Sequence, residues 1–549
     1  MADSDQNSND AAPSESVESN TSKQNIRGMT LTATLLANNS NAKPEQDGDS
    51  ASPKVEEEPP IVTRHAIEVD GRMLRYSVTT GFLPIKNDKG EIEAKIFFMA
   101  YIRDRVDAAD STDSSINSSM DNKADTGVGS SEDNQDRPLM FSFNGGPGSS
   151  SVWLHLGALG PRRVLLNDDG SLPAPPYKLV PNDQTWLGET DLVFIDPVGT
   201  GYSRAKDDET AKKYFGVEGD IECLAEFIRL FLTRNNRWAS PLYLAGESYG
   251  TTRGAGLAGY LVERGIAFTG LILISTVLGF QAIRFRAGND LPFALFLPTY
   301  AATAHYHGRL APELQERALP DLLKEVREFA LGDYTLALMQ GNRMHHDSRA
   351  AMAARIARYT GLSEKYVEQC ELRIEHWRFC KELLRDEGRI VGRLDSRLTA
   401  REGDNAAEGP DFDASNAAIR PPFTASINDY LRRSLGYETD QPYEVSGSTV
   451  KDWKWENGSF TDTGAALASA LAKNPHLRVL VTCGYFDLAT PFASAEYTAA
   501  HLPIDPGLRQ NIEFTYYPAG HMMYIEAESL KRFTADVRVF YGGVDPTGG

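Results

Sequence analysis

The sequence predicts an α/β protein with a mainly parallel, doubly wound sheet and a large helical insertion. Short apolar runs alternate with stretches of helical periodicity along most of the chain, and this alternation stops over residues 281–449. Alternating strands and helices are typical of a parallel sheet that carries helices on both faces. A hydrophobic content of 41% and a charged content of 24% are ordinary for a globular core.

Two polar segments carry most of the net charge of −20. Residues 1–60 and residues 106–136 each have a net charge of −7, and both are rich in Ser, Asn and Asp. Such segments do not bury enough apolar surface to offset the entropy of the chain. We therefore expect a disordered acidic tail at 1–60, with a partner-binding role as the alternative. Residues 106–136 lie between two predicted strands and are expected to form a disordered surface loop.

The remaining residues exclude several classes of partner. Their net charge is −6, so no basic domain is available to neutralise phosphates, and nucleic acid is not an expected partner. No run approaches about 18 consecutive apolar residues, so no membrane span is predicted. The first 28 residues are polar and lack the pattern of a signal peptide, which predicts a cytoplasmic protein. A true start at Met29 would instead allow an exported or periplasmic protein.

The predicted core comprises residues 61–280 and 450–549. A hairpin is expected at 64–80, where alternating strands flank Asp70-Gly71. Helices are expected at 221–235 and directly after Ser248. The other strands of the sheet are expected at 91–102, 137–143, 191–196, 241–246, 270–276, 477–485 and 512–520.

The insertion at 281–449 is predicted to be mostly helical. Helical periodicity is clearest at 311–340 and 375–394. Its arginines are interleaved with Asp and Glu, which is typical of solvated helix faces.

The four cysteines do not indicate a disulfide scaffold. Cys223 lies in a helical pattern and Cys483 in a strand pattern, so both are expected to be buried. Cys370 and Cys380 have a spacing that allows a pair but also suits two points on one helix.

No metal and no cofactor are expected. The insertion contains two histidine pairs, His305 with His307 and His345 with His346. Neither pair has a third ligand at a recognised metal-binding spacing.

Ser248 is the candidate nucleophile. It lies in the pentapeptide Gly246–Gly250, which has the form G-x-S-x-G, after a predicted strand and before a predicted helix. The pentapeptide alone also suits a simple tight turn. A strand–serine–helix order instead favours a sharp corner on which the hydroxyl is presented for chemistry.

The partners of a nucleophilic serine are expected in the order Asp and then His, each after a strand. Asp487 follows the predicted strand at 477–485, and His521 follows the strand at 512–520. Asp487 alone could be the cap of the next helix, and His521 alone could be a structural histidine. Their order and context with Ser248 predict a catalytic triad.

An acyl-transfer site also needs hydrogen-bond donors for the oxyanion. The segment "FNGGPGSSS" at 143–151 follows a predicted strand, and its glycines allow backbone N–H groups to approach a ligand. A simple Gly-Pro turn is the alternative interpretation.

Taken in order, these motifs resemble the serine carboxypeptidase family of α/β-hydrolases, in particular its bacterial members. The resemblance covers about residues 64–545 and rests on "NGGPGSSS", "DPVGTGYS", "GESYG", "LFLPTY", "GYFDLATP" and "GHMMY". It implies the α/β-hydrolase fold, with the helical insertion as a cap over the cleft.

The resemblance also implies roles for individual residues. Ser248 is the nucleophile, His521 the general base and acid, and Asp487 the residue that orients the histidine. The implied oxyanion donors are the backbone N–H groups of Gly146 and Tyr249. The residues implied to contact substrate are Asn144 and Glu247, which hold its terminal carboxylate, and Tyr249 and Met522, which lie beside the pockets at the scissile bond.

The chain departs from the family pattern at two positions. Ser149 replaces a cysteine that is usually part of a disulfide, and Ala158 replaces a second acid that partners Glu247. A lone Glu247 beside a substrate carboxylate is expected to have a raised pKa, which favours peptide hydrolysis on the acidic side of neutral.

The expected activity is a serine carboxypeptidase that acts on peptides with a free C-terminal carboxylate through an acyl-enzyme. An esterase or acyltransferase with the same triad is the first alternative, and a non-catalytic interaction protein is the second. The sequence leaves the oligomeric state open.

Overall fold

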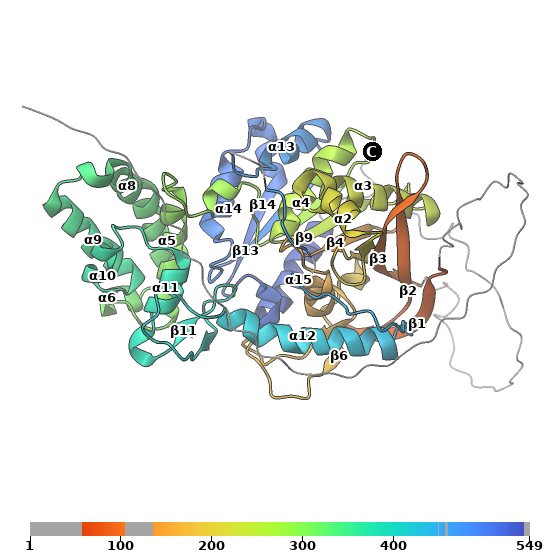
Figure 1. Cartoon of the computed structure of the whole chain (residues 1–549), viewed down its shortest axis with the longest axis horizontal. Helices are drawn as coiled ribbons and strands as arrows, with labels where there is room; N and C mark the ends of the chain where they lie inside the picture. Colours follow the sequence, from red (N-terminus) through yellow and green to blue (C-terminus); the bar gives the residue numbers. More distant parts are fainter. Residues whose placement is uncertain (1–57, 105–135, 448–449, 456–458, 543–549) are drawn as a thin grey trace, which may run out of the picture. The chain divides into compact units, whose positions relative to one another are not determined.

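The centre of the protein is a mixed sheet with the strand order β1-β2-β3-β7-β4-β9-β10-β13-β14 (Figure 1). The larger part of the sheet is parallel and comprises β7, β4, β9, β10, β13 and β14. The other part is antiparallel and comprises β1, β2 and β3, with β3 pairing with β7. The bounds are β1 Ile61–Val69, β2 Arg72–Lys86, β3 Ile92–Arg103, β4 Leu139–Phe143, β7 Asp191–Ile195, β9 Leu242–Glu247, β10 Gly270–Ile274, β13 Arg478–Gly484 and β14 Ile512–Tyr517. The structure therefore has a strand at each predicted position.

This computed structural model describes residues 58–104, 136–447, 450–455 and 459–542. These residues belong to one compact unit that spans Val55–Gly549. The predicted disordered tail at 1–60 and the predicted loop at 106–136 lie almost entirely outside the described residues.

The predicted hairpin joins β1 and β2. Asp70 and Gly71 connect the strands with φ angles of 50° and 73°, and the pairing runs from Val69 opposite Arg72 to Ile61 opposite Thr80. A two-residue turn with positive φ at both positions matches the twist of the strands it joins. This hairpin extends the sheet beyond its parallel part.

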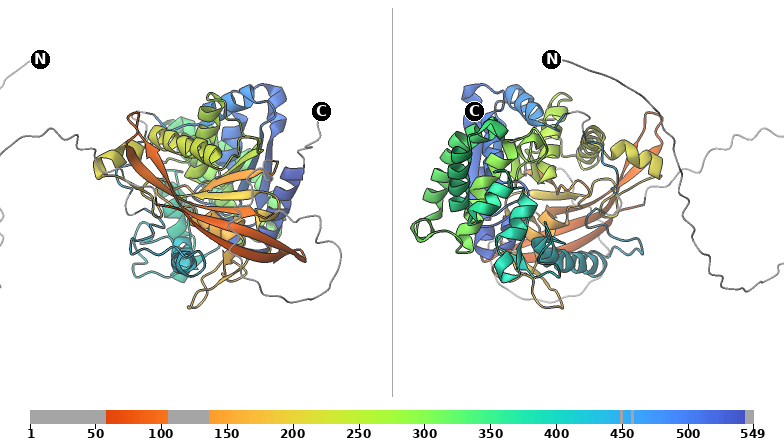
Figure 2. Two further views of the ribbon diagram at one scale, coloured as in Figure 1. Left: turned by 90° about the vertical axis from the view of Figure 1, so that its right-hand side faces the viewer. Right: turned by 60° about the vertical axis from the view of Figure 1, so that its left-hand side comes forward.

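Helices cover both faces of the sheet (Figure 2). Two separate hydrophobic clusters fill the space between the sheet and its helices. One face carries α3 Val217–Arg234, α4 Tyr249–Val262, α13 Gly464–Lys473 and α14 Phe492–Ala500. The other face carries α1 Val152–Leu154, the π-helical turn η3 His155–Leu159, α12 Ala414–Arg433 and α15 Ala527–Gly542. This is the α/β-hydrolase fold that the sequence predicts.

The region between β10 and α13 is mostly helical, and it contacts both faces of the sheet. Helix α5 packs against α14, whereas α12 packs against α1 and β5 Arg162–Val164. The other helices of this region are α6 Pro312–Gln315, α7 Leu319–Phe329, α8 Thr335–Gln340, α9 His346–Thr360, α10 Glu364–Gln369 and α11 His376–Glu382. The long α5 is Leu291–Tyr306.

The segment 375–394, predicted to be helical, is helical only as far as Glu387. Helix α11 ends at Glu382, Gly388 has a φ of 63°, and the two-residue strand β11 Ile390–Val391 pairs with β12 Thr399–Ala400. Gly388 is the C-cap of a separate short 3-10 helix, η8 Arg385–Glu387, which its left-handed conformation ends.

The cysteines are free and buried, as the patterns of Cys223 and Cys483 predict. Cys370 follows α10 and Cys380 lies within α11, so the two do not share one helix. Within the described part of the chain, no helix has both the length and the apolarity to cross a bilayer.

Candidate active site

Ser248 forms a strained corner between β9 and α4. Its φ of 60° and ψ of −130° lie outside the regions that L-residues prefer. The chain can turn so sharply because glycines stand two positions before and after Ser248. A Cβ on Gly246 would lie 2.3 Å from the Gly250 carbonyl oxygen. The serine side chain is half-buried. This is the geometry in which a strand-to-helix turn presents a nucleophile.

Asp487 and His521 form a buried pair at the ends of neighbouring strands. The Nδ1 of His521 lies 2.7 Å from Oδ2 of Asp487. The other carboxylate oxygen of Asp487 accepts the backbone N–H groups of Ala489 and Thr490 at 2.7 and 3.0 Å. Asp487 thus caps a local turn, whereas α14 begins after Pro491 and is not capped by it. One carboxylate orients the imidazole and is itself held in place.

The electrostatic surroundings of His521 favour its protonated form. Burial alone lowers its pKa, but the carboxylates of Asp487 and Glu247 outweigh that effect and raise it above the ordinary value. An imidazole supported in this way can accept a proton during the reaction and hold the resulting charge.

Ser275 links the serine corner to the histidine loop. It follows β10, the strand between β9 and β13. The backbone N–H of Ser248 donates to Ile274 at 2.9 Å, and the hydroxyl of Ser275 donates to the His521 carbonyl at 2.6 Å. All three predicted triad residues therefore lie at the same edge of the sheet, where the parallel strands end.

The glycine-rich loop after β4 runs beside the start of α4. A Cβ on Gly145 would lie 2.4 Å from the backbone nitrogen of Tyr249, so only glycine permits this approach. Gly146 follows with a φ of 105°. Across the described ranges, the backbone N–H groups of Gly146 and Tyr249 donate to no protein acceptor. Two N–H groups in this position suit the predicted oxyanion site.

Asn144 and Glu247 are brought together as predicted. The Asn144 amide donates to Oε1 of Glu247 at 3.0 Å, and the Tyr524 hydroxyl donates to Oε2 at 2.6 Å. Burial raises the pKa of Glu247 to about 7, although both donors oppose that rise. Tyr524 was not among the predicted site residues. It follows the histidine loop by three positions, and nothing local in "GHMMY" indicates a contact with Glu247.

Three further positions from the sequence analysis are the predicted contact residue Met522 and the two departures from the family pattern, Ala158 and Ser149. Met522 is buried directly after His521. Ala158 is fully buried in η3, and its carbonyl accepts the Asn182 amide at 2.7 Å. Ser149 donates its backbone N–H to Gly145 at 3.0 Å, so the turn is closed by backbone bonding.

A buried ion pair braces the same loops, and sequence reasoning missed it. Arg253 on α4 donates to Asp220 on α3 at 2.7 Å and to the Asn144 carbonyl at 2.6 Å. Its guanidinium also lies over the rings of Phe143 and Tyr249, 5.0 and 5.2 Å from their centroids. One arginine thus holds the residues that flank the predicted oxyanion site.

The segment Gly392–Leu398 of the helical region contacts both catalytic loops. The His521 N–H donates to the Leu394 carbonyl at 2.6 Å, and the Leu488 N–H donates to the Arg393 carbonyl at 3.0 Å. Asp395 accepts the Gly520 N–H at 3.2 Å. The helical region therefore helps to hold Asp487 and His521 in place.

A Gly520→Ala substitution tests this contact. The added Cβ would lie 2.5 Å from both the Asp395 Cβ and the Leu394 carbonyl oxygen, and it would push the His521 loop away. We expect kcat to fall by roughly 10- to 100-fold, because small displacements at a catalytic site are costly. Gly332→Ala is the control, since a Cβ there meets nothing within 4 Å. Unchanged turnover of Gly520→Ala would show that the contact does not position His521.

No cluster of His, Cys, Asp or Glu suitable for a metal occurs among the described residues. His305 and His307 lie near the carbonyls of Arg317 and Ser396, at 3.1 and 2.7 Å. The absence of a metal from the reaction stays a prediction.

Comparison with known proteins gives matches of different lengths. Residues 127–270 match the family model described as serine carboxypeptidase. Serine carboxypeptidase-like 5 of Arabidopsis thaliana is 34% identical over 115 residues, which is 20% of this chain and 25% of that protein. The pheromone-processing carboxypeptidase KEX1 of Saccharomyces cerevisiae is 36% identical over 137 residues, 22% of this chain and 16% of that protein.

The match to solved structures is much longer. The crystal structure of a prohormone-processing carboxypeptidase, KEX1(delta)p from Saccharomyces cerevisiae, superposes with a TM-score of 0.52. The superposition covers 86% of this chain and 93% of the yeast chain at 16% sequence identity, which shows a shared fold. The sequence alignments span about a quarter or less of the curated relatives. The family-model match at residues 127–270 includes Ser248 but not Asp487 or His521.

Proposed function

We propose that the protein is a serine carboxypeptidase, a proposal supported by the match of residues 127–270 to the serine carboxypeptidase family model. The observation that carries the proposal is the arrangement of the triad. The Asp487–His521 pair lies at the same sheet edge as Ser248, which occupies a strained strand-to-helix corner. A strained backbone at a serine in this place supports its assignment as the nucleophile.

In the proposed reaction, Ser248 attacks the carbonyl carbon of the last peptide bond. His521 takes the hydroxyl proton on Nε2, while Asp487 holds Nδ1 and stabilises the imidazolium. The negative oxygen is bound by the N–H groups of Gly146 and Tyr249. Return of the proton to the leaving amine releases the C-terminal residue and leaves an acyl-enzyme. Water then repeats the sequence, with His521 as the base, and frees the shortened peptide.

The terminal carboxylate of the substrate is proposed to contact Asn144 and Glu247. The amide of Asn144 can donate to it, whereas an ionised Glu247 repels it. Burial raises the pKa of Glu247 to about 7, so the neutral, compatible form predominates below that pH. Recognition of a free carboxylate should therefore weaken as the pH rises through about 7.

The test compares a blocked dipeptide with its C-terminal amide across a range of pH. We expect kcat/KM for the free acid to exceed that for the amide by roughly 10- to 100-fold at acidic pH. The ratio of the two should fall on the alkaline side. Because His521 acts on both substrates, its own titration cancels in the ratio. Equal rates at every pH would contradict carboxylate recognition.

An esterase or acyltransferase with the same triad is the second candidate. Ala158 stands where the family usually has a second acid, and the Tyr524 ring packs against the preceding Gly157. Faster hydrolysis of small acyl esters than of any peptide would favour this candidate over the first.

We further propose that residues 281–449 act as a cap over the cleft, with residues 61–280 and 450–549 as the core. Peptides with a free C-terminus are the proposed partners. The cytoplasmic location and the role of the acidic tail depend on residues outside those that the structure describes, and they stay predictions.

A further inference from the structure

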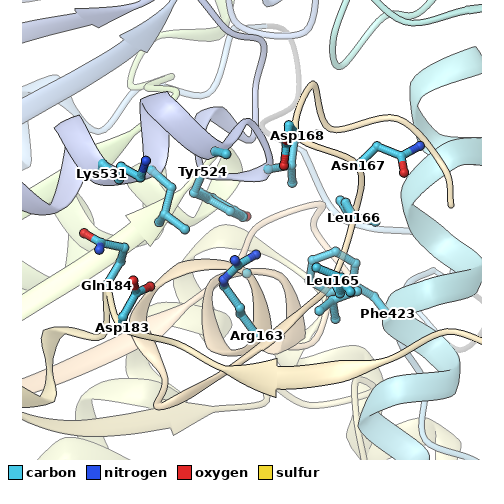
Figure 3. A pocket seen from close by; sticks show the side chains of 15 residues that line it. Arg163, Leu165, Leu166, Asn167, Asp168, Asp183, Gln184, Phe423, Tyr524 and Lys531 are labelled. Atoms are coloured by element: carbon cyan, nitrogen blue, oxygen red, sulfur yellow. The ribbon is translucent and has the colours of Figure 1, made fainter. Parts of the chain in front are cut away.

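Tyr524 occupies an unusual position between Glu247 and a small cavity. Its ring helps to line a cavity of about 100 Å³ (Figure 3), while its hydroxyl donates to Oε2 of Glu247 at 2.6 Å. The side chain is 2% exposed, so no solvent competes for this hydrogen bond. Both oxygens of Glu247 are therefore occupied, one by Tyr524 and the other by Asn144.

The local packing is fitted to a large ring at this position. A Cβ on Gly157 would lie 2.4 Å from the Tyr524 ring and 3.4 Å from that of Phe423, so any larger residue there would displace the tyrosine. Because Gly157 has no side chain, the ring can lie directly against the backbone there. The ring is thus held by packing, independently of its hydroxyl.

The charged and titratable groups around Glu247 come from three elements. Tyr524 and His521 lie in the segment after β14, Asp487 follows β13, and Asn144 follows β4. Burial and the neighbouring Glu247 raise the pKa of the Tyr524 hydroxyl well above 10, so it keeps its proton across the working range of the enzyme. It is a permanent donor, and donation to a carboxylate stabilises the ionised form.

We propose that Tyr524 is a positioning residue that fixes the Glu247 carboxyl and sets the pH range over which the site accepts a free C-terminal carboxylate. The inference rests on the proposed carboxypeptidase function. The hydroxyl keeps Glu247 more easily ionised than burial alone would allow, so it limits peptide recognition at alkaline pH. The phenol donates to Glu247 in both of its protonation states, whereas a second carboxyl group would repel Glu247 once both were ionised.

Tyr524→Phe tests the inference, since it removes one oxygen and keeps the ring that packs on Gly157. The measurement is the ratio of kcat/KM for a free-acid dipeptide to that for its amide, followed against pH. We expect the midpoint at which this ratio falls to move upward by about one pH unit, because the ionised Glu247 has lost a donor. In a Glu247→Gln background, which has no group to titrate, Tyr524→Phe should cause no shift.

Tyr517→Phe is the matched control. The Tyr517 hydroxyl also donates to a carboxylate, Asp536, at 2.7 Å, but the pair is not part of the site. We expect its pH midpoint to equal that of the unaltered protein. If the free-acid to amide ratio still fell with pH in Tyr524→Phe, with the same midpoint as in the unaltered protein, the role of Tyr524 would be overturned. The proposed recognition of the carboxylate would then stand. A ratio that does not change with pH in the unaltered protein would overturn both this role and the proposed recognition of the carboxylate.

Discussion

Replacing Ser248 with alanine is expected to lower kcat by roughly 10⁴- to 10⁶-fold, because the acyl-enzyme can no longer form. The fold should survive. Alanine has the same Cβ as serine, so the strained corner at φ 60° costs the same in both proteins. The backbone bonds of the corner, from Ser248 to Ile274 and from Thr251 to Ser248, do not involve the removed oxygen.

The measurement is steady-state turnover of a blocked dipeptide, together with thermal unfolding. Covalent labelling by a fluorophosphonate should be lost at the same time, since the reagent needs the activated hydroxyl. Ser348→Ala, on the exposed face of α9, serves as the control and should retain both labelling and turnover. An active Ser248→Ala protein with an unchanged unfolding temperature would remove Ser248 from the mechanism.

The sheet could be predicted because its signals are local. The parallel strands are short apolar runs, the hairpin strands alternate, and the turn at Asp70-Gly71 carries its own sequence signature. The path of the helical region could not be predicted in the same way. Helix α12 packs on the opposite face of the sheet from α5, and periodicity reports only that a helix has an apolar side, not which surface it meets. At 375–394 the helical pattern extends past the end of α11 at Glu382, because Ile390–Val391 pair with Thr399–Ala400 instead.

In the candidate site too, some residues could be predicted from local sequence signals and others could not. Ser248, Asp487 and His521 could be found because each follows a strand, and parallel strands bring their ends together. The supporting contacts could not be found, since their partners are far apart in the chain. Tyr524 and Glu247 are separated by 277 residues, and Arg253 and Asn144 by 109. Such pairs are set by packing, for which one sequence carries no local signature.

Asp487→Asn is the second substitution expected to lower kcat strongly. The hydrogen bonds of Asp487 explain why. One oxygen of Asp487 accepts the N–H groups of Ala489 and Thr490, at 2.7 and 3.0 Å, and the other faces Nδ1 of His521 at 2.7 Å. In the amide, the oxygen must stay on the two backbone donors, because an NH₂ group there would leave them unsatisfied. The NH₂ group is therefore directed at His521.

An NH₂ donor beside Nδ1 reverses the tautomer of His521. The ring proton moves to Nε2, which then has no lone pair with which to accept the proton of Ser248. We expect kcat to fall by roughly 10⁴-fold at neutral pH with little change in KM, since substrate contacts are intact. Asp505→Asn is the control: Asp505 also caps a turn, through the Gly507 N–H at 2.7 Å, and should keep full activity. If Asp487→Asn lost less than about tenfold, the orientation of His521 would have to come from other groups, of which the Thr490 hydroxyl at 3.2 Å is the nearest available.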